Sequence, residues 1–216
     1  MGGDHPSTAV RGRRGRIALV SVVLGMLTGC GREPEDVPCP DIAEGELVIT
    51  ELRGPQDGDD SFGEWIELFN ASDSDVDLFG LRIDIVPLDG RDPVIVLVRR
   101  EGVIVGPGEY AVVGKHNDSN LPEYVDYGFA LTSAAKGLFQ NAFVELSGCD
   151  VLVDRVLYRD LPTVGTLALD PSTEPSAKRN DEETAFCNDA ADPEPGAATG
   201  FGQPGTPGEA NRACEG

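Results

Sequence analysis

The fold is decided by residues 63–83, which read GEWIELFNASDSDVDLFGLRI. In residues 64–69 every second side chain falls on the same side of an extended chain, with Ile66 and Leu68 together on one side. This period of two is typical of a β-strand. Residues 70–75 follow as a largely polar segment whose side chains can hydrogen-bond their own backbone, and apolar residues resume directly after it. The stretch therefore predicts two strands joined by a polar corner.

Short apolar segments of the same kind recur through the rest of the chain, separated by turn-forming residues. The predicted strands are residues 47–53, 64–70, 76–86, 94–99, 110–114, 143–146, 151–158 and a weak one at 176–179. No window shows a helical period over ten residues or more. This pattern predicts an all-β fold, an antiparallel β-sandwich, with residues 45–187 as one domain and the Gly- and Pro-rich residues 188–216 as a tail that wraps it. The only tryptophan, Trp65, is expected to pack in the sandwich, with ligand stacking as the alternative.

Several short motifs follow one another along this domain. They are LVITEL at 47–52, GEWIELFN at 63–70, DVDL at 75–78, GL at 80–81, GPGEY at 106–110, DRV at 154–156 and TPGEAN at 206–211. Together they resemble the lamin tail domain, an immunoglobulin-like β-sandwich, over residues 45–211. One position departs from that family, which often has Trp where Leu81 stands. The resemblance implies an immunoglobulin-like fold that binds protein or other macromolecular partners through its surface.

The N-terminal residues predict an export signal. Four arginines between residues 11 and 16 precede an apolar run at residues 17–27. A membrane-spanning helix needs about 20 apolar residues, and this run is shorter. The run ends in LTGC, which resembles the bacterial lipobox, where the cysteine is acylated and becomes the first mature residue. We therefore expect residues 1–29 to be a lipoprotein signal peptide and Cys30 to hold the protein at a membrane through its lipid. An ordinary secretory signal, with Cys30 incidental, is the alternative.

Residues 30–44 are polar and interrupted by prolines, so they are predicted to form a flexible tether after the acylated cysteine. Gly31 follows Cys30, which by resemblance to known lipoprotein sorting favours the outer membrane or the cell surface. The expected location is therefore the cell envelope.

The mature chain would be strongly acidic. Removal of residues 1–29 takes away four arginines and one aspartate, leaving 13 basic and 37 acidic residues and a formal charge of −24. Such a charge repels phosphate backbones, and the only dense basic cluster leaves with the signal, so nucleic acid is disfavoured as a partner. The charge favours cations or basic partners, or is an adaptation to an extracellular setting.

Four cysteines remain besides Cys30, an even number that predicts two disulfides in an oxidising compartment. Three pairings are possible. We expect Cys39 to pair with Cys214, joining the ends of the domain, and Cys149 to pair with Cys187. The rival, a four-thiolate zinc site, lacks the C-x-x-C pair that such sites usually contain.

Catalytic motifs are weak in this sequence. After signal cleavage His116 is the only histidine, and its polar, turn-like surroundings predict a solvated loop residue. There is no G-x-S-x-G motif, and the G-x-G-x-x-G at residues 200–205 lacks a preceding strand. Glu64 and Glu67 lie an odd number of residues apart on an expected strand, which argues against a glycosidase pair there. We therefore predict no catalytic residue.

Acidic loops offer the strongest chemical rival, a weak calcium site. The candidate ligands are Asp57, Asp59 and Asp60 in one loop and Asp73, Asp75 and Asp77 in another. A third loop holds Asn117, Asp118 and Asn120. Turns capped by Asp and Asn side chains explain these residues equally well.

These observations favour a lipid-anchored, extracytoplasmic protein that acts as a non-catalytic binding or adaptor module. Its membrane contact would be the lipid, and its further partner would be an unidentified protein or polymer. Two alternatives remain open: a calcium-dependent adhesion module, and an enzyme or enzyme accessory that acts on an extracellular polymer through carboxylates.

Overall fold

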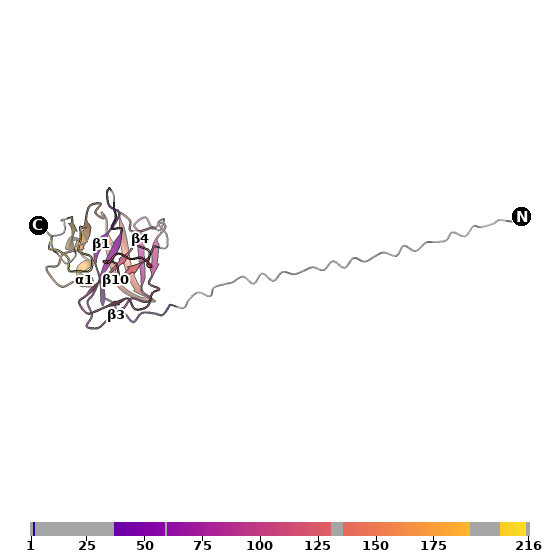
Figure 1. The fold of residues 1–216 in the computed structure, drawn as a ribbon, viewed down its shortest axis with the longest axis horizontal. Coiled ribbons are helices and arrows are strands. Elements are labelled where there is room, and N and C mark those ends of the chain that lie inside the picture. Colours follow the sequence, from indigo (N-terminus) through magenta and orange to yellow (C-terminus); the bar gives the residue numbers. More distant parts are fainter. Residues whose placement is uncertain (1, 3–36, 59, 131–135, 191–203, 215–216) are drawn as a thin grey trace. The chain divides into compact units, whose positions relative to one another are not determined.

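The computed structural model describes residue 2 and residues 37–58, 60–130, 136–190 and 204–214. The described residues from 37 onward form one compact unit, in which strands are stacked in layers (Figure 1). Apart from residue 2, the predicted signal peptide lies outside the described residues, as do Cys30, residues 31–36 of the predicted tether and Asp59. No helix among the described residues has both the length and the apolar composition to cross a bilayer.

Nearly all regular structure is β, and the strands form two main sheets. The six-stranded sheet has the order β12 (Phe186–Asp189), β11 (Thr166–Leu169), β1 (Leu47–Arg53), β2 (Trp65–Asn70), β7 (Tyr110–Gly114), β8 (Tyr127–Gly128). The four-stranded sheet has the order β10 (Val151–Tyr158), β9 (Ala142–Gly148), β4 (Arg82–Pro87), β5 (Val94–Leu97). A small ribbon pairs β3 (Val76–Asp77) with β6 (Ile104–Val105). Every strand pair except β7 with β8 is antiparallel, which confirms the predicted all-β sandwich.

The predicted bounds of β1, β7 and β10 agree with the structure, but the single strand predicted over 76–86 was wrong. The chain leaves β3 and turns into β4, which belongs to another sheet. The turn is built on Asp77, whose Oδ1 accepts a hydrogen bond from Phe79 N at 3.0 Å, and on Gly80, whose φ is +93°. A side chain at Gly80 would collide with the backbone of Pro38, so the turn depends on glycine.

The weak strand predicted at 176–179 was also wrong. Residues Ala177–Asn180 form the short helix α1, followed by a 3₁₀ turn at Glu183–Ala185. The buried residue of α1 is Asn180, which fastens the helix to the sheets. Its side chain donates hydrogen bonds to Ile49 O at 3.0 Å and to Asp154 Oδ2 at 2.7 Å. The conformation of this segment therefore depends on contacts with residues far away in the sequence, which the local pattern of apolar residues could not reveal.

The main core lies between the two sheets. It includes Ile49, Leu52, Ile66 and Leu68 from the larger sheet and Ile83, Ile85, Val144 and Leu146 from the smaller one, all fully buried. Trp65 is fully buried in a second cluster with Val112, Tyr124 and Val125, so the expectation that it packs in the sandwich is confirmed. Burial of such apolar area is the main driving force for folding.

Both faces of the central strands are buried, which the alternation of the sequence did not indicate. All seven residues of β1 and all six of β2 are buried. The β1–β2 register shifts between Ile49 and Glu51, which marks a β-bulge. Ile49 and Leu52 both face the main core although they are three residues apart, so the bulge places Thr50 and Glu51 together on the opposite face.

The four cysteines form two disulfides, as predicted, but the predicted pairing was wrong. Cys39 is joined to Cys149 with a Cα–Cα distance of 5.5 Å, and Cys187 is joined to Cys214 with a Cα–Cα distance of 5.8 Å. Cys149 lies in the turn between β9 and β10, where the neighbouring Gly148 packs close to Pro40 and brings Cys39 within reach. Each bridge is therefore set by which segments the sandwich brings together.

Candidate functional site

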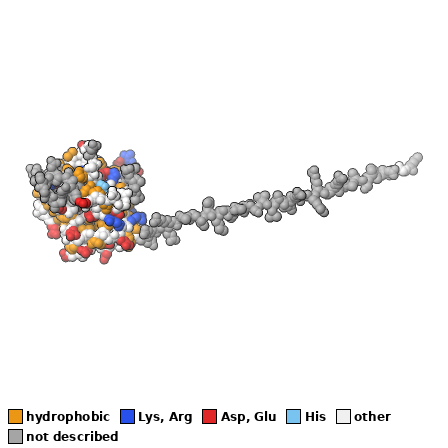
Figure 2. Space-filling model, viewed as in Figure 1, with side chains coloured by type: hydrophobic (Ala, Val, Ile, Leu, Met, Phe, Trp, Pro, Cys, Tyr) orange, Lys and Arg blue, Asp and Glu red, His pale blue; other side chains and the backbone are white. Residues whose placement is uncertain are grey.

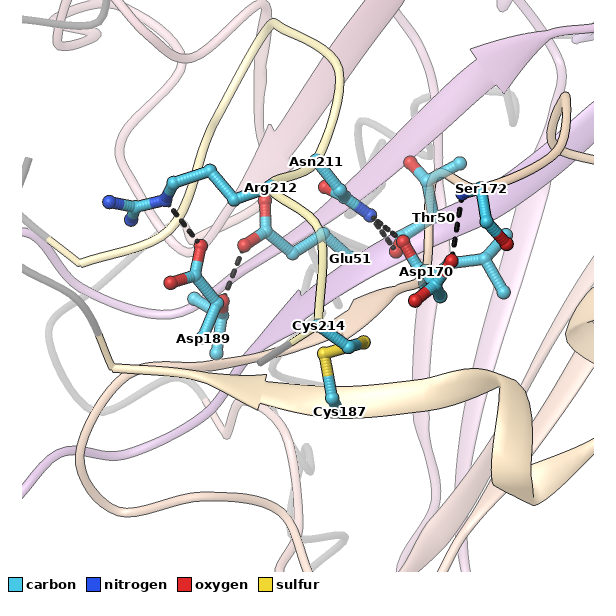
Figure 3. Close-up of a disulfide and its surroundings, with 11 residues drawn as sticks. Thr50, Glu51, Asp170, Ser172, Cys187, Asp189, Asn211, Arg212 and Cys214 are labelled. Atoms are coloured by element: carbon cyan, nitrogen blue, oxygen red, sulfur yellow. Dashed lines mark hydrogen bonds and ion pairs between the residues drawn. A yellow bond between two sulfur atoms is a disulfide. The ribbon is translucent and has the colours of Figure 1, made fainter. Parts of the chain in front are cut away.

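The face of the larger sheet that turns away from the main core carries two fully buried carboxylates. Glu51 of β1 and Glu67 of β2 are register partners, and both have a relative exposure of 0%. Residues 204–214, here called the C-terminal segment, contribute Thr206, Gly208 and Asn211 to their surroundings. Figure 3 shows Asn211 of this segment near Glu51 and Thr50.

Glu51 is held by hydroxyl and backbone donors. Thr166 Oγ1 donates to Glu51 Oε1, and Thr206 N donates to both carboxylate oxygens, at 3.3 and 3.2 Å. Glu67 accepts from Thr50 Oγ1 at 2.7 Å and from Gly208 N at 2.8 Å. Two neighbouring strands and the C-terminal segment are thus joined through two side chains.

Asn211 closes the same network. Its Nδ2 donates to Thr50 O and to Leu169 O, both at 2.9 Å, so both amide protons are used. Its Oδ1 lies 3.0 Å from Thr206 Oγ1 and must accept that hydroxyl proton. Thr206 Oγ1 also lies 3.2 Å from Glu51 Oε2, and one hydroxyl has only one proton to donate. The second contact is satisfied when Glu51 is protonated and donates to Thr206 Oγ1.

The electrostatics agree with this proton count. Burial raises the pKa of Glu51 to about 7, against the lowering effect of the hydrogen bonds from Thr166 and Thr206. Burial also raises the pKa of Glu67 well above its ordinary value, and the nearby charge of Glu51 raises it further. Two buried carboxylates that repel one another in this way cannot readily both be charged.

An ion pair and a disulfide fasten the end of the C-terminal segment. Arg212 Nε donates to Asp189 Oδ2 at 2.9 Å, and Cys214 is bonded to Cys187 on β12 (Figure 3). We call this arrangement the clamp. The carboxylate oxygens of Glu51 and Glu67 accept hydrogen bonds from β1, β11 and the C-terminal segment. Neither residue has exposed surface on which a substrate could bind.

The acidic pair that the fold brings together is Glu51 with Glu67, which the alternation of the sequence did not indicate, and not Glu64 with Glu67. Glu64 lies just before β2 and binds Lys115 Nζ and Leu138 N, each at 2.6 Å. A signal for the real pair was present, because LVITEL, GEWIELFN and TPGEAN each contribute a polar residue to the clamp. Their meeting in space required the register of β1 and β2.

The predicted calcium ligands are engaged in local contacts or lie exposed. Asp60 forms an ion pair with Arg53 at 3.0 Å, and Asp57 Oδ2 accepts from Thr163 Oγ1 at 2.9 Å. Asp77 caps the turn after β3, whereas Asp73 and Asp75 are exposed. Within the described ranges, no three His, Cys, Asp or Glu side chains are grouped so as to hold a metal ion. The calcium site stays a prediction.

His116 is not the solvated loop residue that the sequence predicted. It is half-buried, its Nε2 lies 3.0 Å from Phe62 O, and its ring meets Tyr124 edge-on with a centroid distance of 6.1 Å. The imidazole thus packs between the loop before β2 and residues near β8.

No protein-family model matches the chain, and no curated protein matches it.

Proposed function

We propose that this protein is a lipid-anchored, extracytoplasmic binding or adaptor module with a lamin-tail-like fold and no chemistry of its own. The observation that carries the proposal is the clamp. Glu51 of LVITEL and Glu67 of GEWIELFN accept hydrogen bonds from residues of TPGEAN, and these contacts hold the C-terminal segment on the sheet. Because these buried groups are used to stabilise the fold, we propose that partners bind to the exposed surface of the domain.

Two further observations support an extracytoplasmic setting. Both disulfides close with ordinary Cα–Cα distances, and disulfides persist mainly in oxidising compartments. Acidic side chains are prominent on the visible face of the domain, mostly in its lower part, with some basic ones among them (Figure 2). Such a surface favours solubility and weakens non-specific binding to nucleic acid.

The anchor is tested by labelling the producing cells with a fatty acid and analysing the membrane fraction by mass spectrometry. We expect a mature protein that begins at an acylated Cys30 and a Cys30→Ser variant that carries no lipid and leaves the membrane fraction. An unmodified Cys30 in a membrane-bound wild-type protein would reject the lipid anchor.

The absence of chemistry is tested with a panel of polysaccharide, peptide and phosphodiester substrates. We expect no turnover that survives purification. Turnover that is lost in Glu67→Gln while the melting temperature is retained would assign a reaction to the buried pair and reject the proposal.

A further inference from the structure

The four-stranded sheet has one covered edge and one open edge. At β10 the edge is covered, since Gly45 N donates to Val153 O at 2.8 Å and Ile49 N donates to Asp154 Oδ2 at 2.7 Å. At β5 the sheet order ends, and the described residues place no strand beyond it. Strand edges of this kind offer unpaired backbone groups to another extended chain.

The register of β4 and β5 shows which backbone groups point outward. Val98 N donates to Leu81 O at 2.9 Å and Val98 O accepts from Gly80 N at 2.9 Å, so the backbone groups of Val98 face β4. By the alternation of an antiparallel pair, those of Ile95 and Leu97 face away from the sheet. Tyr127 Oη, which donates to Leu97 O at 3.1 Å, closes only one end of this edge.

Apolar side chains accompany the open backbone. Ile95 is 55% exposed, among the most exposed large hydrophobic residues described. It lines a groove of about 420 Å³ together with Leu97, Tyr127 and Phe129. A strand laid along β5 could place alternate side chains against this apolar lining.

The charge of the groove is opposite to that of the protein. Its lining includes Arg82 and Arg99 and no carboxylate, although acidic residues far outnumber basic ones in the chain. Arg82 is paired with Asp84 at 2.7 Å, whereas Arg99 is exposed and its guanidinium has no carboxylate partner among the described residues. The groove therefore complements a negatively charged ligand.

We propose that the β5 edge and its groove bind an extended, acidic peptide segment of a partner protein as an added strand. The inference rests on the proposed function, since it names the partner chemistry of the binding module. The open N–H and C=O groups favour a peptide, because they match the backbone of another strand. A second copy of this chain fits less well, because two-fold pairing of β5 would bring the arginines of one groove against the arginines of the other.

The test uses the purified full chain in detergent and a displayed library of random nine-residue peptides. We expect enriched peptides to carry Asp or Glu between apolar residues. For a synthetic copy of the best peptide, Arg99→Glu is expected to weaken binding at least tenfold by fluorescence anisotropy. Arg159→Glu, which reverses an exposed arginine outside the groove, is expected to change binding less than twofold.

A second variant addresses the backbone. Ile95→Pro removes an N–H that points away from β4, so it spares the sheet and is expected to weaken binding at least fivefold. Ile95→Thr, which keeps that N–H and a β-branched side chain, is expected to bind more tightly than Ile95→Pro. Melting temperatures within a few degrees of the wild type show that each variant is folded.

Three outcomes overturn the site: enriched peptides without acidic residues, equal binding by the wild type and Arg99→Glu, or sedimentation of a dimer that Ile95→Pro dissociates. If the selected peptides bind every edge variant equally, the protein is still a binding module but uses another surface. If neither peptides nor components of the cell envelope bind, the proposed function fails as well.

Discussion

Glu51 and Glu67 face one another across β1 and β2 with no exposed surface, and each accepts a backbone hydrogen bond from the C-terminal segment. One acidic residue from each of two neighbouring strands therefore holds a chain segment that is more than 130 residues away from both in sequence. The contacts that Thr206 Oγ1 makes with Asn211 and Glu51 are both satisfied when Glu51 carries a proton.

Stability should fall as the pH rises. Burial raises the pKa of Glu51 from 4.5 to about 7, so the folded state binds the proton more tightly than the unfolded state. The stabilisation is complete below the unfolded pKa and is lost as the pH rises through the folded pKa. From pH 5 to pH 8 we expect the free energy of unfolding to drop by on the order of 3 kcal/mol, measured by urea denaturation.

The Glu51→Gln variant should make that pH profile less steep, because its amide can donate to Thr206 Oγ1 at every pH, while Glu67 still titrates. Glu174→Gln, which changes an exposed carboxylate, is the matched control and should follow the wild-type profile. A wild-type protein that becomes more stable between pH 5 and pH 8 would contradict the proton count.

Asn211→Ala should destabilise the protein by about 3 kcal/mol, because it leaves the buried carbonyls of Thr50 and Leu169 without their donor. Urea denaturation followed by Trp65 fluorescence measures the loss. Asn188→Ala, at an exposed position on β12, should cost less than about 0.5 kcal/mol. Equal costs for the two variants would show that the C-terminal segment contributes little.

The two disulfides should differ in their contribution to stability. The Cys39–Cys149 bridge spans 110 residues and the Cys187–Cys214 bridge spans 27. The chain-entropy relation gives about 4.8 and about 3.6 kcal/mol for these loops. Paired Cys→Ser variants, compared by urea denaturation, should rank in this order. Peptide mapping without reduction checks the pairing, and a Cys39–Cys214 peptide would contradict the fold.

Trp65→Ala should cost about 3–5 kcal/mol, since it opens a cavity in a fully buried cluster. Trp65→Phe should cost much less, because no described residue accepts a hydrogen bond from Trp65 Nε1. The melting temperatures of the two variants, measured by circular dichroism, test this difference. In the wild type, the fluorescence of this single tryptophan should be blue-shifted and poorly quenched by acrylamide until the protein unfolds.

The sequence by itself determined the all-β class, the bounds of several strands and the number of disulfides. Alternation of apolar residues is a local property, so β1, β7 and β10 could be read from it. The even set of cysteines likewise required no spatial information. Residue 81 illustrates the limit: Leu81 fits a continuous strand by pattern, but the turn at Gly80 separates β3 from β4.

Only the tertiary structure decided which distant segments meet. The bulge after Ile49 turned Thr50 and Glu51 to the same face, and the C-terminal segment then buried that face. Disulfide pairing, the helix at Ala177–Asn180 and the open edge at β5 depend in the same way on neighbours far along the chain. Side-chain periodicity sets which face a residue takes within its own strand, whereas the partner that covers that face is chosen by packing.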